Sequence, residues 1–118
     1  MKKGFYFIAA AQEDKEGKSF NAPQLEEGSF ENHGLLMVNR PIDYKNRPHR
    51  WKISHIESGA CVQQHLSLSQ ARKLVKSLQG FKIWNIKTYD DIQSAVQSSE
   101  HEGDVKTIKA LCMFHDSY

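Results

Sequence analysis

The sequence contains few of the residues that mark specialised protein classes. Only two of its 118 residues are cysteines and three are prolines, and no apolar run approaches the length of a membrane span. Cys61 and Cys112 lie in no Cys-x-x-Cys or Cys/His pattern, so no zinc or redox motif is present and we expect two buried free thiols. We expect no membrane partner.

The first eleven residues have the order of a secretory signal but not its length. Met1, Lys2 and Lys3 are followed by an apolar run that becomes polar at Gln12. A signal peptide needs about 15 to 30 residues, so the Phe-Tyr-Phe-Ile centre of this segment predicts a first β-strand instead. With no Asn-x-Ser/Thr sequon either, we expect a cytoplasmic protein.

The known catalytic motifs are absent as well. The chain has no Gly-x-Ser-x-Gly, His-Glu-x-x-His, P-loop or Gly-x-Gly-x-x-Gly sequence. Its composition, 39% hydrophobic and 25% charged, is typical of a small soluble globular protein. We therefore predict one domain over residues 1–118, with no enzymatic activity, no catalytic residue, no metal and no cofactor.

The charge is distributed unevenly, although the formal net charge is only +2. Residues 1–39 carry four lysines and six acids, residues 40–88 carry ten cations and two acids, and residues 89–118 carry two lysines and six acids. A basic middle between two acidic segments indicates contact with a macromolecule or pairing of the segments with each other.

The order of elements predicts an α+β fold. After the first strand, residues 12–33 are rich in glycine and acids and are expected to form a long acidic loop, an uncommon feature that would be functional or mobile or would contain a short strand. Residues 34–39 predict a second strand. We expect an antiparallel sheet of three to five strands, with two or three helices (about 68–79, 90–99 and 104–114) packed on one face.

Residues 51–66 predict a β-hairpin around Ser58-Gly59. A two-residue turn would pair Trp51 with Leu66 and Ile53 with Gln64 on a mostly apolar face that also carries His55. The opposite, mostly polar face would hold Lys52 opposite His65 and would be open to solvent or a ligand.

The leading functional candidate is the basic loop that precedes and enters this hairpin. Cations neutralise phosphates, aromatic rings stack on bases, and prolines restrict the loop, so the segment predicts contact with nucleic acid or a nucleoprotein. Arg47, Arg50 and Lys52 are the expected phosphate ligands and Tyr44 the stacking residue. The full predicted set is Arg40, Tyr44, Lys45, Arg47, Arg50, Lys52 and His65.

Two other functions fit the sequence, and so does a plain solvated surface. Glu26, Glu27, Asp90 and Asp91 in the acidic segments would allow docking on a basic protein, as in an antitoxin, an immunity protein or an anti-defence inhibitor. A small enzyme would have to use one of His49, His55 or His65. Charge runs also occur on loops that only face water.

Overall fold

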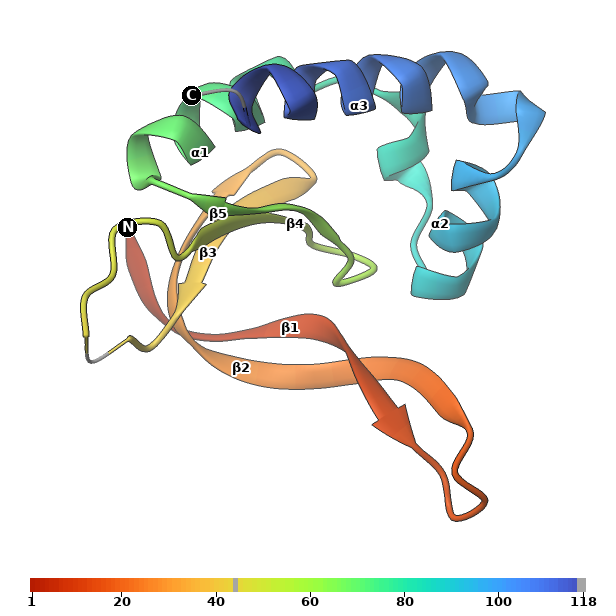
Figure 1. Ribbon diagram of the computed structural model, residues 1–118, viewed down its shortest axis with the longest axis horizontal. Coiled ribbons are helices and arrows are strands. Elements are labelled where there is room, and N and C mark those ends of the chain that lie inside the picture. The colour runs from red at the N-terminus through yellow and green to blue at the C-terminus, as the bar shows by residue number, and fades with distance from the viewer. Residues whose placement is uncertain (44, 117–118) are drawn as a thin grey trace.

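The computed structural model describes residues 1–43 and 45–116 and has the expected α+β fold. Five antiparallel strands form one sheet in chain order, so every connection is between neighbours (Figure 1). The strands are β1 (Lys2–Glu13), β2 (Ser19–His33), β3 (Leu36–Pro41), β4 (Trp51–His55) and β5 (Cys61–Leu66).

Helices follow the sheet in the sequence and lie together in space (Figure 1). They are α1 (Leu68–Ser77), the 3-10 helix η1 (Lys82–Asn85), α2 (Tyr89–Val96), the 3-10 helix η2 (Ser99–His101) and α3 (Glu102–Asp116). The start of α1 has the capping box that its sequence predicts, in which the Ser67 hydroxyl accepts from the Gln70 amide and the Ser67 amide donates to Gln70. Among the described residues, no helix is both long and apolar enough to cross a membrane.

The prediction of a long acidic loop over residues 12–33 is wrong. Most of it forms β2, whose residues 19–30 pair with the whole of β1, from Lys2 opposite Phe30 to Glu13 opposite Ser19. Only the short turn after Glu13 is irregular, where the Asp14 carboxylate accepts from the amides of Glu16 and Lys18. The two strands make a long ribbon whose tip projects from the rest of the protein (Figure 1).

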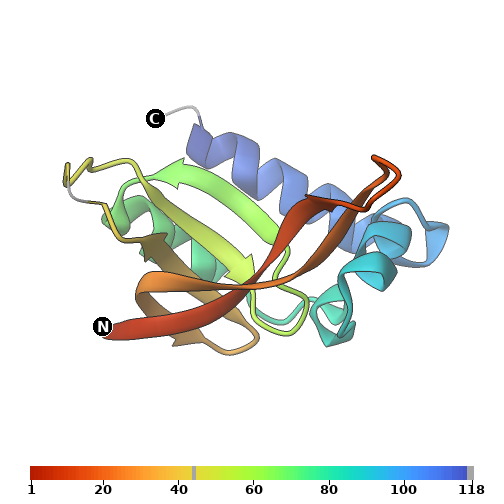
Figure 2. The same ribbon diagram turned by 90° about the horizontal axis from the view of Figure 1, so that it is seen from below.

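The sheet bends so strongly that this ribbon crosses the face of β3, β4 and β5 opposite α1 (Figure 2). The amide of Ala9 in β1 donates a hydrogen bond of 3.0 Å to the carbonyl oxygen of Gly59, in the turn between β4 and β5. The central strands are therefore covered on both faces, and Asn39 and Ser54, which point toward the ribbon, are buried and hydrogen-bonded to each other at 3.0 Å.

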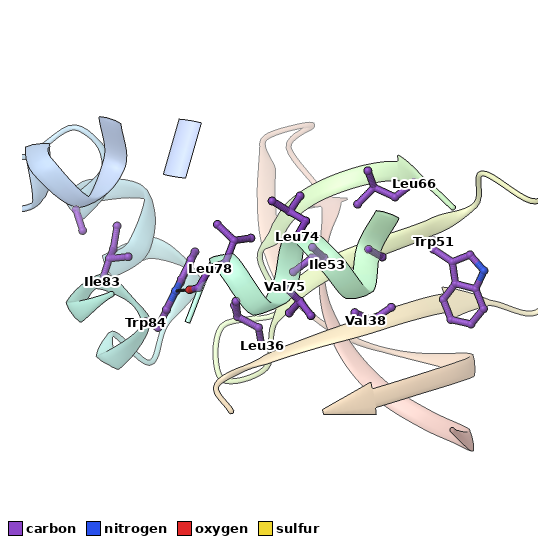
Figure 3. Packing of buried hydrophobic residues seen from close by; sticks show 12 residues of the cluster. Leu36, Val38, Trp51, Ile53, Leu66, Leu74, Val75, Leu78, Ile83 and Trp84 are labelled. Atoms are coloured by element: carbon purple, nitrogen blue, oxygen red, sulfur yellow. Dashed lines mark hydrogen bonds between the residues drawn. The ribbon is translucent and has the colours of Figure 1, made fainter. Parts of the chain in front are cut away.

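The main hydrophobic core lies on the other face of the central strands, under α1 (Figure 3). Leu74, Val75 and Leu78 of the helix pack on Val38 and Ile53 of the sheet. Residues 81–86 include η1, which brings Ile83 and Trp84 into this core. The Trp84 indole donates to the Leu78 carbonyl oxygen at 2.7 Å, which attaches η1 to the end of α1.

The hairpin is confirmed, but its predicted register holds only at one end. Trp51 pairs with Leu66 as expected, whereas Ile53 pairs with Gln63 and Ser54 with Cys61. Two register shifts between these pairs lengthen the turn beyond two residues. The face expected to meet solvent is instead covered at Ser54, because the ribbon crosses it. Cys61 lies on the exposed surface, contrary to the expected buried thiol.

Candidate nucleic-acid interface

The predicted basic loop is a surface segment between β3 and β4. It lies at the end of the molecule where β1 begins, so residues near the N-terminus become its neighbours (Figure 1). Lys45, Arg47 and His49 are exposed, and Arg50 is half-buried. Tyr44, the predicted stacking residue, lies outside the described residues.

One carboxylate organises this loop. The Asp43 side chain is only 3% exposed, and its Oδ2 accepts a hydrogen bond from Arg47 Nε at 3.1 Å and lies 3.6 Å from Arg50 Nε. Its Oδ1 accepts from the Lys45 backbone amide at 3.0 Å. A single negative charge therefore holds two guanidinium groups beside each other, and the cluster keeps a net positive charge.

The electrostatics of Asp43 agree with this geometry. Burial acts to raise the pKa of the Asp43 carboxyl, but hydrogen bonds from the Lys45 amide and from Arg47 outweigh it, so the pKa lies below its usual value. The carboxylate is thus ionised at neutral pH, when it holds both arginines. Since each guanidinium has five N–H donors, the hydrogen bond to Asp43 leaves Arg47 donors for a second anion.

Arg40 enters the same region from the end of β3. Its guanidinium lies 4.7 Å from the ring centroid of Trp51, within the range of a cation–π contact. Trp51 is 6% exposed and belongs to the core, so its ring contacts the Arg40 cation and is not free to stack on a base. This stacking restricts the Arg40 side chain before any ligand binds.

A surface hollow of about 300 Å³ lies between Arg40 and the start of the ribbon. The residues that line it include the basic Lys3 and Arg40, the acidic Glu27 and Asp43, and Ser29. Gly28, which also lines the hollow, allows β2 and the end of β3 to approach closely, because a Cβ there would lie 2.0 Å from the Arg40 carbonyl oxygen. Lys3 was not among the predicted site residues.

Lys52 and His65 do not join this cluster. Lys52 points to the inner face of the bent sheet, where its Nζ lies 3.5 Å from Glu26 Oε2, the oxygen that also accepts from the Tyr6 hydroxyl. Burial, and then this hydrogen bond to Glu26, raises the pKa of Tyr6. His65 lies on β5, at the edge of the sheet opposite β1, and has φ 61°. It is next to the register shifts in the pairing of β4 with β5, which displace it from Lys52.

Sequence reasoning missed the aromatic part of this surface. Phe5 and Phe7 are 61% and 59% exposed, and Leu25, the partner of Phe7 across the ribbon, is 52% exposed. All three point away from the body of the protein, because Tyr6 between the two phenylalanines points inward. The alternation of Lys3, Phe5 and Phe7 was the available signal, but it needed the partner strand β2 to show which face is outside.

The four predicted acidic residues do not form one shared surface. They are Glu26 and Glu27 of β2 and Asp90 and Asp91 of α2. Successive residues of a strand point to opposite faces, so Glu26 faces inward to Lys52 while Glu27 lines the hollow. Asp90 and Asp91 are exposed in the first turn of α2, where the Thr88 hydroxyl caps the helix by accepting from the Asp91 amide at 3.2 Å. Docking through these acids stays a prediction.

The histidines are also placed separately. His55 is buried, with Nδ1 at 2.8 Å from the Ser58 hydroxyl and Nε2 at 2.7 Å from the Trp84 carbonyl oxygen, so both ring nitrogens are engaged within the protein. Burial lowers the pKa of His55, against opposing effects of the Trp84 carbonyl and Glu57. His49 is exposed on the basic loop. The described part of the chain contains no group of three His, Cys, Asp or Glu side chains placed to hold a metal.

Comparison with known proteins adds no relative. The sequence matches no protein-family model and no curated protein, and the structure matches no solved structure.

Proposed function

We propose that this protein is a small, non-catalytic binding module that contacts nucleic acid, or a nucleoprotein, through the loop 40–50. The observation that carries this proposal is the pair Arg47 and Arg50, held on an exposed loop by the one carboxylate of Asp43. Such a cluster presents more positive than negative charge to the solvent, and its side chains have less freedom to lose when a phosphate binds.

The neighbouring groups support a polyanion as the ligand. Lys3, Ser29 and Arg40 line the adjacent hollow, and Lys45 is exposed on the loop. Together these groups provide cations and a hydroxyl at several points along one surface, which suits a repeating phosphate backbone better than a single small anion. Lys52 and His65, which the sequence suggested as further contacts, are not part of the proposed surface.

Binding of labelled oligonucleotides at low salt tests the proposal. We expect mixed-sequence nucleic acid to bind wild-type protein at about 50 mM salt, and the double variant Arg47→Ala with Arg50→Ala to bind at least about tenfold more weakly. The control is Lys73→Ala with Lys76→Ala, which removes the same formal charge from exposed positions of α1. Absence of binding by wild type, or equal weakening by both double variants, contradicts a specific role for the loop.

A further inference from the structure

Phe5 and Phe7 form an exposed aromatic strip beside the basic loop. They lie two residues apart on the same face of β1, about 7 Å apart along the strand. Leu25 continues the strip on β2, and Ile42, whose amide donates to the Glu27 carbonyl oxygen at 3.1 Å, continues it toward the loop. Four large apolar side chains in one exposed patch indicate a binding surface.

The charge around this strip indicates what would cover it. On the same outward face, Lys3 precedes Phe5 along β1, and Arg40 lies opposite Ser29 of β2. The loop with Arg47 and Arg50 continues from Ile42. The same face also carries Glu27, opposite Phe5. A ligand that suits the apolar side chains and the cations of this surface combines flat apolar groups with negative charges, and a nucleic-acid strand does so with its bases and phosphates.

The exposed rings further distinguish a single strand from a duplex. Base faces inside a duplex are covered by the neighbouring base pairs, so Phe5 and Phe7 can stack only on bases that are unpaired or at an end. Phe5 and Phe7 are exposed on one side of the ribbon, and Tyr6 between them is buried on its other side. Their position therefore suits stacking of two successive bases.

We propose that the ligand is single-stranded nucleic acid, with bases stacked on Phe5 and Phe7 and the backbone held by the basic loop. This inference rests on the proposed nucleic-acid function and adds the class of strand. Phosphate contacts alone would bind duplex and single strand through charge, whereas the aromatic strip adds affinity only for unpaired bases.

Competition binding with matched variants tests this assignment. A labelled single strand of about 16 nucleotides is competed with its own duplex and with inorganic polyphosphate, which has charge but no bases. We expect the single strand to bind at least about tenfold more tightly than the duplex. Phe5→Ala with Phe7→Ala should weaken single-strand binding at least about tenfold and leave polyphosphate binding unchanged. Phe5→Tyr with Phe7→Tyr, which keeps both rings, should retain binding.

Phe20→Ala provides the aromatic control. Phe20 is also exposed, at 45%, but it pairs with Gln12 near the ribbon tip, at the other end of β1 from Lys3. We expect this variant to bind as wild type does. Equal affinity for duplex and single strand, or unchanged affinity after loss of Phe5 and Phe7, overturns the single-strand assignment and leaves arginine-dependent binding intact. Self-association that disappears with Phe5→Ala and Phe7→Ala, without oligonucleotide binding, assigns the strip to a second copy of the chain and overturns both proposals.

Discussion

The backbone amide of Ala9 donates to the carbonyl oxygen of Gly59 at 3.0 Å, and this contact joins the first strand of the sheet to the turn of the last hairpin. Gly59 has φ 72°, and a Cβ at this position would lie 2.5 Å from the Ala9 nitrogen. Only glycine combines this backbone conformation with so close an approach of two segments of the backbone. The contact attaches the ribbon that carries Phe5 and Phe7 to the turn between β4 and β5.

Gly59→Ala should therefore destabilise the protein more than the same change at Gly17. Gly17 has φ 81° with no atom within 4 Å of the added Cβ, so Gly17→Ala introduces left-handed strain alone, about 1 to 2 kcal/mol. Gly59→Ala adds a clash and loss of the Ala9 hydrogen bond, and we expect about 2 kcal/mol more. Urea unfolding measures both. Equal free energies of unfolding for the two variants would show that the contact contributes nothing.

Stability should fall as the pH drops below about 6.5, because of His55. The ordinary pKa of histidine is 6.5, and burial places the pKa of folded His55 below it. Between the folded pKa and 6.5, the unfolded chain binds a proton that the folded protein does not. The contribution of neutral His55 to the free energy of unfolding is therefore present above pH 6.5 and is lost as the pH falls through the folded pKa. Thermal unfolding between pH 5 and about 7.5 measures the slope.

His55→Gln should flatten that slope, whatever its effect on stability at pH 7. The exposed His49 on the basic loop supplies the control, since His49→Gln leaves the buried imidazole in place. A slope that persists in His55→Gln, or disappears in His49→Gln, would assign the pH dependence to another group.

The ion pair between Glu31 and Arg72 should be visible in the titration of Glu31. Arg72 donates from Nε at 2.8 Å and from Nη2 at 3.1 Å to the two carboxylate oxygens. These bonds, against the opposing effect of burial and with help from His33, lower the pKa of Glu31 to about 2. Its contribution to stability is present above the ordinary pKa of 4.5 and is lost as the pH falls from there through about 2.

NMR titration of the Glu31 carboxyl checks this pair directly. In Arg72→Gln we expect the pKa of Glu31 to move most of the way back toward 4.5, because the largest cause of its shift is removed. Lys73→Gln, at the next position of α1, should leave it unchanged. A carboxyl that titrates near 4.5 in wild-type protein would contradict the observed geometry.

Local sequence signals predicted the parts of the fold that depend on neighbouring residues. The predicted pairing of Trp51 with Leu66 is confirmed, and the caps found at Ser67 and Thr88 likewise follow from short sequence spacings. Each involves groups whose geometry is determined by side-chain chemistry within one helix turn or one hairpin.

β2 was missed because its polar composition resembles that of a loop. The strand contains Pro23, which lacks an amide hydrogen, but Pro23 pairs with Ala9, whose own amide points to Gly59. At this position neither Ala9 nor Pro23 needs to donate a backbone hydrogen bond to the other strand, so proline is compatible with the pairing of β1 and β2. That compatibility depends on the register of β2 against β1, which no pattern within residues 19–33 shows.

The candidate site was predicted only in part for the same reason. Lys45, Arg47 and Arg50 are close in sequence and lie on one loop, and Arg40 lies at the end of β3 just before it. Lys52 turns to the opposite face because strand residues alternate, and Lys3 and Phe5 reach the loop only through the ribbon.

The salt dependence of oligonucleotide binding tests the central claim most directly. For single strands, each neutralised phosphate adds about 0.7 to the slope of log affinity against log salt. If Arg47 and Arg50 each bind one phosphate, replacing both with alanine should reduce the slope by about 1.4, whereas Lys73→Ala with Lys76→Ala should leave it as in wild type. Identical slopes for wild-type protein and the arginine variant, or no binding by wild type at low salt, would contradict the proposed function.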